Sequence, residues 1–165
     1  MGKPPVVAVV GKSGAGKTTF LEKLIKELKE RNIKVGTIKH HVHDFEMDKP
    51  GKDTWRHAQA GADAVIIASP EKVALIKRVE REPSLDQVTE LLSDMDIILV
   101  EGYKSCDKPK IEISRRAFST ELLCAPEELL ALVSDGAWEI GVPVFGLDDA
   151  SSVAALLAEK YGLTG

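Results

Sequence analysis

The segment VVAVVGKSGAGKTTFLEKL, residues 6–24, constrains the fold more than any other part of this 165-residue chain. A β-branched apolar run stops at Gly11, and apolar side chains return at helical spacing after Lys17. The residues between them match Gly-x-x-x-x-Gly-Lys-Thr, the pattern of a phosphate-binding loop, or P-loop. A preceding strand and a following helix are the context in which this loop forms. We therefore predict a nucleotide-binding loop made of Gly11, Lys12, Ser13, Gly14, Ala15, Gly16, Lys17, Thr18 and Thr19.

Each part of the predicted loop has a chemical role. The glycines permit backbone angles and a close backbone approach that side chains would prevent. The exposed N–H groups form an anion nest at the positive end of the helix dipole. Lys17 is expected to reach the β- and γ-phosphates, which makes it the candidate catalytic residue for any hydrolysis. The Thr18 hydroxyl is expected to bind Mg²⁺, and Thr19 to lie near the α-phosphate.

Strand-like and helix-like segments alternate along the rest of the chain. This alternation predicts an α/β protein with a mostly parallel sheet flanked by helices on both faces, the P-loop NTPase fold. The chain length suits one domain, residues 1–165. Segment 72–79 is expected to be a strand, with a helix as the alternative. The other expected strands are 4–10, 34–39, 64–68, 96–100, 110–114, 130–134 and 142–146, and the expected helices are 17–31, 54–60, 84–92 and 150–161.

Acidic side chains that follow strands are the candidate Mg²⁺ ligands, because ligands bind at the carboxyl ends of parallel strands. Glu101 comes directly after the apolar run DIILV and is expected to hold the metal or its water shell. The alternative is an ion pair between Glu101 and a nearby lysine such as Lys104. Of the four acids in the loop after segment 34–39, we expect Asp48 to face the metal; the other three are Asp44, Glu46 and Asp53.

The same loop is rich in groups that bind phosphate. They are Lys39, His40, His41, His43, Lys49, Lys52 and Arg56. One interpretation is a solvated charged loop, and the other is a site for a second anionic ligand or a partner. The spacing of His41 and His43 also raises the alternative of a transition-metal site.

Base choice is weakly signalled. The guanine-reading pattern Asn/Thr-Lys-x-Asp is absent, but Asp135 and Asp148 each follow a late predicted strand. A carboxylate accepts hydrogen bonds from N1–H and N2–H of guanine, so these residues weakly favour GTP. Asp149 is expected instead to cap the final helix.

Composition excludes several classes of function. The net charge is −4, with 22 basic and 26 acidic residues, which argues against a general nucleic-acid binder. Cys106 and Cys124 form no CxxC pair, so we expect two free thiols. We find no signal peptide and no apolar run of membrane-spanning length, and therefore expect a cytoplasmic protein that does not bind a membrane.

Four segments of the chain resemble a known family. GKSGAGKTTFLEKLI, VGTIKHHVHDFEMDKPGKDTWRHAQAGAD, DIILVEGYK and GVPVFGLDD are similar, in order and spacing, to the molybdopterin-guanine dinucleotide biosynthesis adapter (MobB) family. The likeness covers nearly the whole chain. The first segment is common to many nucleotide-binding proteins, whereas KHHVHDFEMDKPGKDTWR and VEGYK are much more specific to this family.

The resemblance implies a GTP-binding homodimer of the same broad class as the nickel-insertion GTPases, with slow GTP hydrolysis at most. It implies a MobA-type nucleotidyltransferase as partner, the enzyme that joins GMP to molybdenum-bound molybdopterin. It implies that residues 11–19 bind the triphosphate and that Asp48 and Glu101 serve the metal. Lys12 is not a fixed feature of the family, so its role stays open. It implies a second anionic region lined by Lys39, His40, Lys52, Arg56 and Lys104. It also implies a molybdopterin-type cofactor as a ligand of the protein.

Two other classes of protein use the same loop. A small-molecule kinase usually brings arginines on a lid, and the only adjacent pair here is Arg115-Arg116. A metallochaperone GTPase usually carries a cysteine–histidine motif or a histidine tail, and this chain has neither.

Overall fold

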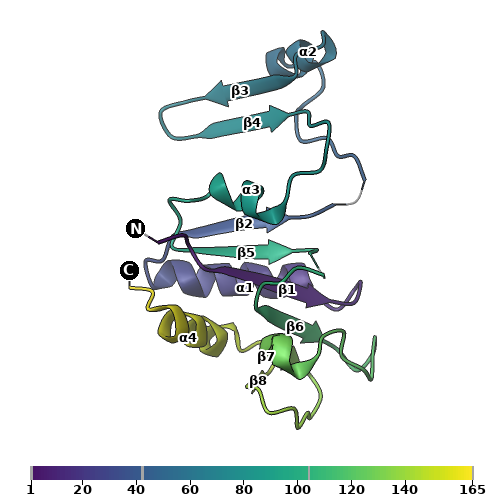
Figure 1. The fold of residues 1–165 in the computed structure, drawn as a ribbon, viewed down its shortest axis with the longest axis vertical. Coiled ribbons are helices and arrows are strands. Elements are labelled where there is room, and N and C mark those ends of the chain that lie inside the picture. The colour runs from purple at the N-terminus through teal and green to yellow at the C-terminus, as the bar shows by residue number, and fades with distance from the viewer. Residues whose placement is uncertain (1, 42, 104, 165) are drawn as a thin grey trace. The chain divides into compact units, whose positions relative to one another are not determined.

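The computed structural model describes residues 2–41, 43–103 and 105–164. Its internal contacts divide the chain into two compact units (Figure 1). The larger unit comprises Met1–His40 and Leu85–Gly165, and the smaller comprises His41–Ser84. The prediction of a single domain stays a prediction.

The larger unit is built on a six-stranded sheet in the order β2-β5-β1-β6-β7-β8. Every neighbouring pair is parallel. Parallel pairing places the carboxyl ends of all six strands at one edge of the sheet, where ligands bind in folds of this kind. The strands are β1 (Val6–Gly11), β2 (Val35–Lys39), β5 (Ile97–Glu101), β6 (Lys110–Ser114), β7 (Leu129–Ser134) and β8 (Val144–Phe145).

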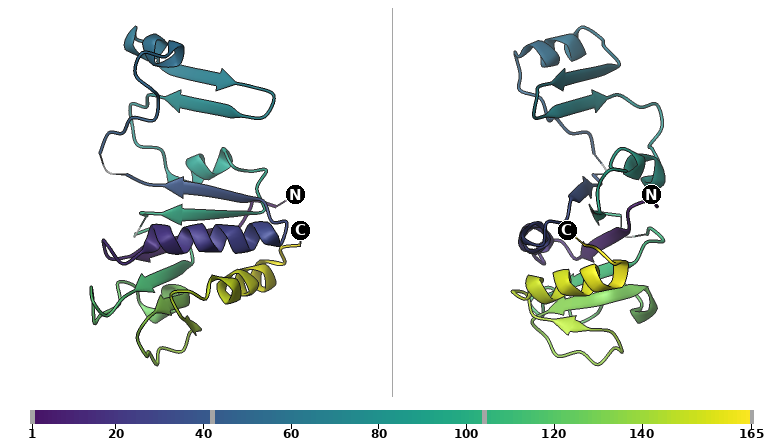
Figure 2. Two further views of the ribbon diagram at one scale, coloured as in Figure 1. Left: turned by 180° about the vertical axis from the view of Figure 1, so that it is seen from behind. Right: turned by 90° about the vertical axis from the view of Figure 1, so that its left-hand side faces the viewer.

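Helices cover both faces of this sheet. α1 (Lys17–Glu30) and α4 (Ala150–Tyr161) pack against each other on one face (Figure 2). The short helix α3 (Leu85–Glu90) covers the other. The predicted class, a mostly parallel sheet flanked by helices on both faces, is confirmed.

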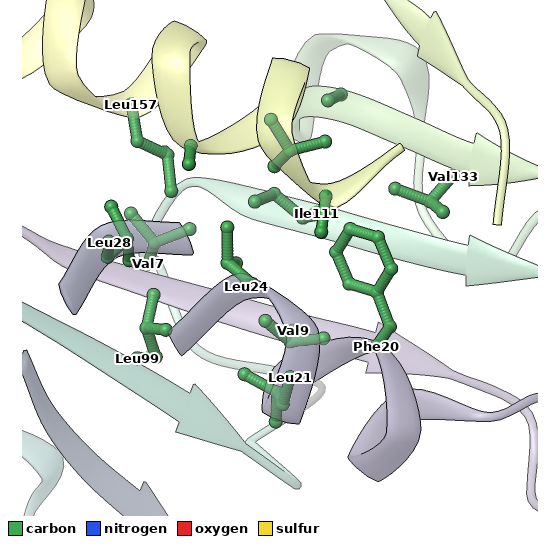
Figure 3. Packing of buried hydrophobic residues seen from close by; sticks show 14 of the residues in the cluster. Val7, Val9, Phe20, Leu21, Leu24, Leu28, Leu99, Ile111, Val133 and Leu157 are labelled. Atoms are coloured by element: carbon green, nitrogen blue, oxygen red, sulfur yellow. The ribbon is translucent and has the colours of Figure 1, made fainter. Parts of the chain in front are cut away.

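The two faces of the sheet are apolar because its strands are buried on both sides. In β5, Ile97 and Leu99 belong to the cluster under α1 and α4, while Ile98 and Val100 belong to the cluster under α3. From α1, Leu24 and Leu28 are fully buried in the first cluster. Figure 3 shows this cluster, in which the labelled residues are Val7, Val9, Phe20, Leu21, Leu24, Leu28, Leu99, Ile111, Val133 and Leu157.

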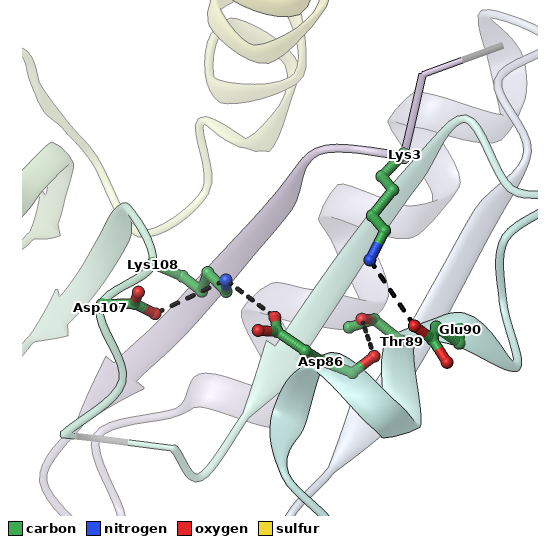
Figure 4. A network of polar contacts seen from close by, with 6 residues as sticks. All are labelled: Lys3, Asp86, Thr89, Glu90, Asp107 and Lys108. Carbon is green, nitrogen blue, oxygen red and sulfur yellow. Dashed lines mark hydrogen bonds and ion pairs between the residues drawn. The ribbon is translucent and has the colours of Figure 1, made fainter.

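Polar contacts anchor α3 and the chain before β6. Lys108 Nζ lies 3.0 Å from Asp86 Oδ1 and 3.5 Å from Asp107 Oδ1 (Figure 4). Lys3 Nζ lies 3.6 Å from Glu90 Oε1. These groups come from the segment before β1, the segment before β6 and α3, at the end of the sheet opposite the loop that follows β1.

The smaller unit contains α2 (Asp53–Gln59) and an antiparallel hairpin of β3 (Ala64–Ala68) and β4 (Val73–Lys77). The hairpin turn is closed by the Ser69 N–H, which donates to the Lys72 carbonyl oxygen at 2.8 Å. Within the predicted segment 72–79, Val73–Lys77 is a strand paired with Ala64–Ala68, and the alternative of a helix is wrong.

Most predicted elements are present, with ends shifted by one or two residues. Segments 64–68, 110–114 and 150–161 are confirmed at both ends. The expected strand 142–146 was too long, because only Val144 and Phe145 pair with β7. Among the described residues, no helix is long and apolar enough to cross a membrane.

Candidate nucleotide-binding site

The loop between β1 and α1 has the backbone geometry of an anion nest. Gly14 and Gly16 take positive φ angles of 79° and 94°, which L-residues with side chains rarely adopt. The Ala15 N–H donates to the Lys12 carbonyl oxygen at 3.1 Å, and this bond closes the turn. Gly16 occupies the N-cap of α1 and has no side chain to cap the helix. The first amides of α1 are therefore available to an anion at its positive end.

Position 11 needs glycine for a different reason, because the neighbouring strand β6 lies very close to its backbone. Gly11 pairs with Ile113 of β6. A methyl group on Gly11 would lie only 2.5 Å from the Ile113 carbonyl oxygen. No side chain fits at this position without moving backbone.

The Lys17 side chain folds back across the loop. Its Nζ donates to the carbonyl oxygens of Gly11 and Lys12, both at 3.0 Å. The ammonium group is thereby held over the nest, where it adds a positive charge to the field of the backbone amides.

Thr18 and Glu101 meet although 83 residues separate them in sequence. β5 lies beside β1, and Glu101 pairs with Val9, just before the loop. The Thr18 hydroxyl donates to Glu101 Oε1 at 3.4 Å. A hydroxyl and a carboxylate oxygen at one end of a phosphate nest form a donor set that suits Mg²⁺, which prefers oxygen ligands.

Two of the predicted anion-binding residues lie next to this pair. Lys39 pairs with Glu101 across β2 and β5. The His40 N–H donates to the Glu101 carbonyl oxygen at 2.8 Å, and the His40 ring lies tilted against the Tyr103 ring with centroids 4.3 Å apart. Gly102 makes this approach possible, because a methyl group there would lie 2.7 Å from the His40 carbonyl oxygen.

The remaining members of the predicted anionic region belong to the smaller unit. Lys52 is the N-cap of α2, and Arg56 lies one turn further along, with its N–H donating to the Lys52 carbonyl oxygen at 2.9 Å. Asp48 Oδ1 accepts the Lys49 N–H at 2.8 Å. The predicted roles of all three toward ligands of the larger unit stay predictions. Lys104 lies outside the described residues.

The two candidate base-reading residues differ in their contacts. Asp135 Oδ1 accepts the Arg116 N–H at 2.9 Å, and Asp135 directly follows β7. Asp148 Oδ1 is bound by Lys23 Nζ at 2.5 Å, and this hydrogen bond, with the charge of Lys23, lowers the pKa of Asp148. Asp149 caps α4, as expected, by accepting the Ser152 N–H at 3.2 Å.

Histidines 41 and 43 contact each other outside the larger unit. The His43 N–H donates to His41 Nδ1 at 3.2 Å, and the ring centroids are 5.8 Å apart. Within the described parts of the chain, no group of three or more His, Cys, Asp or Glu residues is placed to hold a metal ion.

Two residues beside the loop were not assigned to the nucleotide site from the sequence. The Phe118 ring lies against Gly14, and the Arg115 guanidinium lies against Gly16. Both belong to the turn that follows β6, where the Phe118 N–H donates to the Arg115 carbonyl oxygen at 2.9 Å. The sequence shows only that Arg115 directly follows a predicted strand. That this strand lies beside β1 is decided by the tertiary fold.

The parallel sheet, the glycine loop and the helix that follows it define the class of this protein, a P-loop NTPase fold. The chain belongs to the MobB family: residues 6–135 match the family model described as molybdopterin guanine dinucleotide synthesis protein B.

Curated relatives agree with this assignment. The chain is 37% identical over 152 residues to the molybdopterin-guanine dinucleotide biosynthesis adapter protein of Haemophilus influenzae, a match that covers 91% of this chain and 85% of that protein. It is 36% identical over 163 residues to the adapter protein of Escherichia coli, covering 94% and 92%. This chain is thus a MobB-family adapter in molybdopterin guanine dinucleotide biosynthesis.

Solved structures agree as well. A crystal structure of molybdopterin-guanine biosynthesis protein B matches with a TM-score of 0.73 and 30% identity, over 94% of this chain and 99% of that one. The crystal structure of Bacillus subtilis MobB matches with a TM-score of 0.73 and 30% identity, over 94% and 97%.

Proposed function

We propose that this chain is a GTP- and Mg²⁺-binding adapter that assists a MobA-type nucleotidyltransferase as it attaches GMP to a molybdopterin-type cofactor. The observation that carries the proposal is the loop after β1, with its positive-φ glycines, its overlying Lys17 and its Thr18–Glu101 contact. The family assignment supports a role in molybdopterin guanine dinucleotide biosynthesis, and the geometry of the loop supports nucleotide binding.

In this proposal the nucleotide's phosphates bind the amides of residues 11–19. Lys17 would exchange its hydrogen bonds to the carbonyls of Gly11 and Lys12 for bonds to phosphate oxygens. The exchange costs little, because the ammonium group gives up neutral carbonyl acceptors for negatively charged phosphate oxygens.

Mg²⁺ would be held by Thr18 and Glu101. The role predicted for Asp48 as a metal ligand stays a prediction. Mg²⁺ usually takes one or two carboxylates and keeps phosphate and water oxygens for the rest of its shell. A cluster of three acidic residues is therefore not needed. When bound, the ion would neutralise charge on the phosphates.

For the base, Asp135 is the stronger candidate of the two. Asp148 is engaged by Lys23, so reading a base would first require that ion pair to open. Asp135 lies at the end of β7, and the turn after it is fixed by the Ser134 hydroxyl oxygen, which accepts the Gly136 N–H and Trp138 Nε1–H at 3.0 Å each. A carboxylate there favours guanine over adenine.

The second anionic region would serve the cofactor. Lys39 and His40 stand beside Glu101 at the carboxyl edge of the sheet, and Lys52 and Arg56 share one turn of α2. We propose that Lys39 and His40, with Lys104, bind anionic groups of a molybdopterin-type ligand, and that Lys52 and Arg56 bind an anion in the smaller unit. We also propose that the adapter is cytoplasmic, that it is a homodimer and that it hydrolyses GTP slowly at most.

The decisive experiment is calorimetry of the chain with GTP and with ATP, each with and without Mg²⁺ and a MobA-type partner. We expect GTP to bind more tightly than ATP and Mg²⁺ to strengthen binding. Asp135→Asn should reduce the preference for GTP, and Asp148→Asn should change it less. Failure of both nucleotides to bind, or turnover near one per second by the isolated chain, would contradict the proposal. Phosphoryl transfer to a small molecule would instead support the kinase alternative.

A further inference from the structure

The fold by itself does not explain why the charged side chain of Arg115 lies against the P-loop. Arg115 directly follows β6, which lies beside β1 in the sheet. Its guanidinium rests on the last glycine of the P-loop: a methyl group on Gly16 would lie 3.3 Å from Arg115 Nη2 and 3.6 Å from both Cζ and Nε. A cation is thus placed against the backbone that receives phosphate in the proposed function.

The hydrogen bonds of this guanidinium are incomplete. Arg115 Nε is buried and has no hydrogen-bond partner among the described residues. A guanidinium carries five N–H donors in a fixed fork, and a buried donor without an acceptor costs free energy. The positive charge of Arg115 makes a small contribution to the lowered pKa of Asp148. The carboxylate of Asp148 is, however, paired with Lys23 and not with Arg115.

A phosphate would supply what is missing. Its non-bridging oxygens accept two parallel N–H bonds from a guanidinium, a geometry that lysine cannot reproduce. The turn after β6 also holds Arg115 in place, because its carbonyl oxygen accepts the N–H groups of Phe118 and Ser119 at 2.9 and 3.0 Å. Phe118 in turn packs on Gly14, so the turn follows the P-loop backbone closely.

We propose that Arg115 is a phosphate ligand of the P-loop, supplied by the same chain, whose guanidinium binds oxygens of the bound nucleotide's phosphates alongside Lys17. This inference rests on the proposed nucleotide site and adds a specific residue to it. It gives Arg115 a binding role that does not require the mobile lid of a kinase.

The test compares Arg115→Gln and Arg115→Lys with wild type by calorimetry, using GTP with Mg²⁺ and inorganic pyrophosphate as probes. We expect Arg115→Gln to lower the affinity for both ligands by about 10- to 100-fold, the usual effect of losing a charged hydrogen bond. Arg115→Lys should bind with intermediate affinity, since it keeps the charge and loses the fork. Arg116→Gln, the matched control one residue away, should bind pyrophosphate, which has no base, like wild type.

Two outcomes would overturn the inference and leave the proposed function standing. In the first, Arg115→Gln binds both ligands within about twofold of wild type, while Lys17→Ala loses binding. In the second, Arg115→Gln lowers the unfolding midpoint of the ligand-free chain and Arg115→Lys restores stability without affinity, which would identify a packing role. If wild type binds neither ligand, the proposed function fails as well.

Discussion

At the scale of single residues, the proposed phosphate site depends on how closely backbone approaches backbone. Gly11 and Ile113 are paired so tightly that there is no space for a methyl group, and Gly14 and Gly16 use angles that other residues avoid. Lys17 is the exception, because its role is carried by its side chain. Two substitutions separate these contributions.

Gly11→Ala tests the close approach. Its methyl group would meet the Ile113 carbonyl oxygen at 2.5 Å, and this clash can be relieved only by moving β1 or β6. We expect a loss of about 1–3 kcal/mol in the free energy of unfolding, measured by urea denaturation. Gly146→Ala is the control, because nothing lies within 4 Å of its Cβ position, and it should change stability by less than about 0.5 kcal/mol. Equal effects in the two variants would contradict the prediction.

Lys17→Ala tests the ammonium group. We expect GTP affinity to fall by about 10- to 100-fold, because charged hydrogen bonds to phosphate are lost. The unfolding midpoint should move by only about 3 °C, since the bonds to Gly11 and Lys12 are partly exposed. Calorimetry and circular dichroism measure the two effects, and Lys26→Ala, on the exposed side of α1, is the control. Global unfolding of Lys17→Ala would give the lysine a structural role.

At the scale of elements, a buried lysine joins β6 to the 3₁₀ turn η1 (Pro126–Glu128). Lys110 is 2% exposed, and its Nζ donates to the Cys106 carbonyl oxygen at 2.8 Å and to Glu128 Oε1 at 2.7 Å. The hydrogen bond from Lys110 lowers the pKa of Glu128 below its ordinary value of 4.5 and raises the pKa of Lys110 above 10.5. The pair therefore keeps its charges at neutral pH.

The sign of these shifts gives a pH dependence. A carboxylate whose pKa is lowered on folding stabilises the fold above its unfolded pKa, and this contribution is lost as the pH falls through the folded pKa. We expect the wild type to lose more stability than Glu128→Gln as the pH falls from about 5 to about 3, measured by thermal unfolding. Glu127→Gln, which removes the neighbouring carboxylate, should follow the wild type. Parallel curves for wild type and Glu128→Gln would show that the pair does not contribute.

At the scale of the whole molecule, the hairpin of the smaller unit exposes several large apolar side chains. Ile66 and Ile67 are 62% and 58% exposed, although neighbouring residues of a strand point to opposite faces. Val73 and Leu75 on β4 are 67% and 47% exposed. A two-stranded hairpin whose two faces are both exposed is only marginally stable by itself. We therefore expect a second copy of the chain to cover this apolar surface in the proposed homodimer.

Ile66→Asp with Ile67→Asp tests this surface. We expect wild type to be a dimer by multi-angle light scattering and the double variant to be a monomer, because two charges cannot be buried in an apolar interface. Glu71→Gln, in the hairpin turn, should leave the dimer intact. A double variant that remains a dimer would move the interface elsewhere on the chain.

The sequence alone was sufficient for the P-loop, the strand–helix alternation and the family resemblance, because these depend on local order: glycines at fixed spacing, apolar periodicity and contiguous motifs. The position of Glu101 was also predictable, since an acid after an apolar strand lies at the ligand-binding edge of a parallel sheet; its role as a metal ligand stays a prediction.

Contacts between distant segments were decided only by the tertiary structure. The pairing of β1 with β5 and β6 brings Glu101 to Thr18 and Arg115 to Gly16, and the sequence contains no local signal for which strands are neighbours. Likewise, Asp135 and Asp148 look equivalent in the sequence, and Lys23, 125 residues from Asp148, distinguishes them. The periodicity of apolar residues predicts which side of a helix or strand is buried. Which element packs against that side depends on the whole fold.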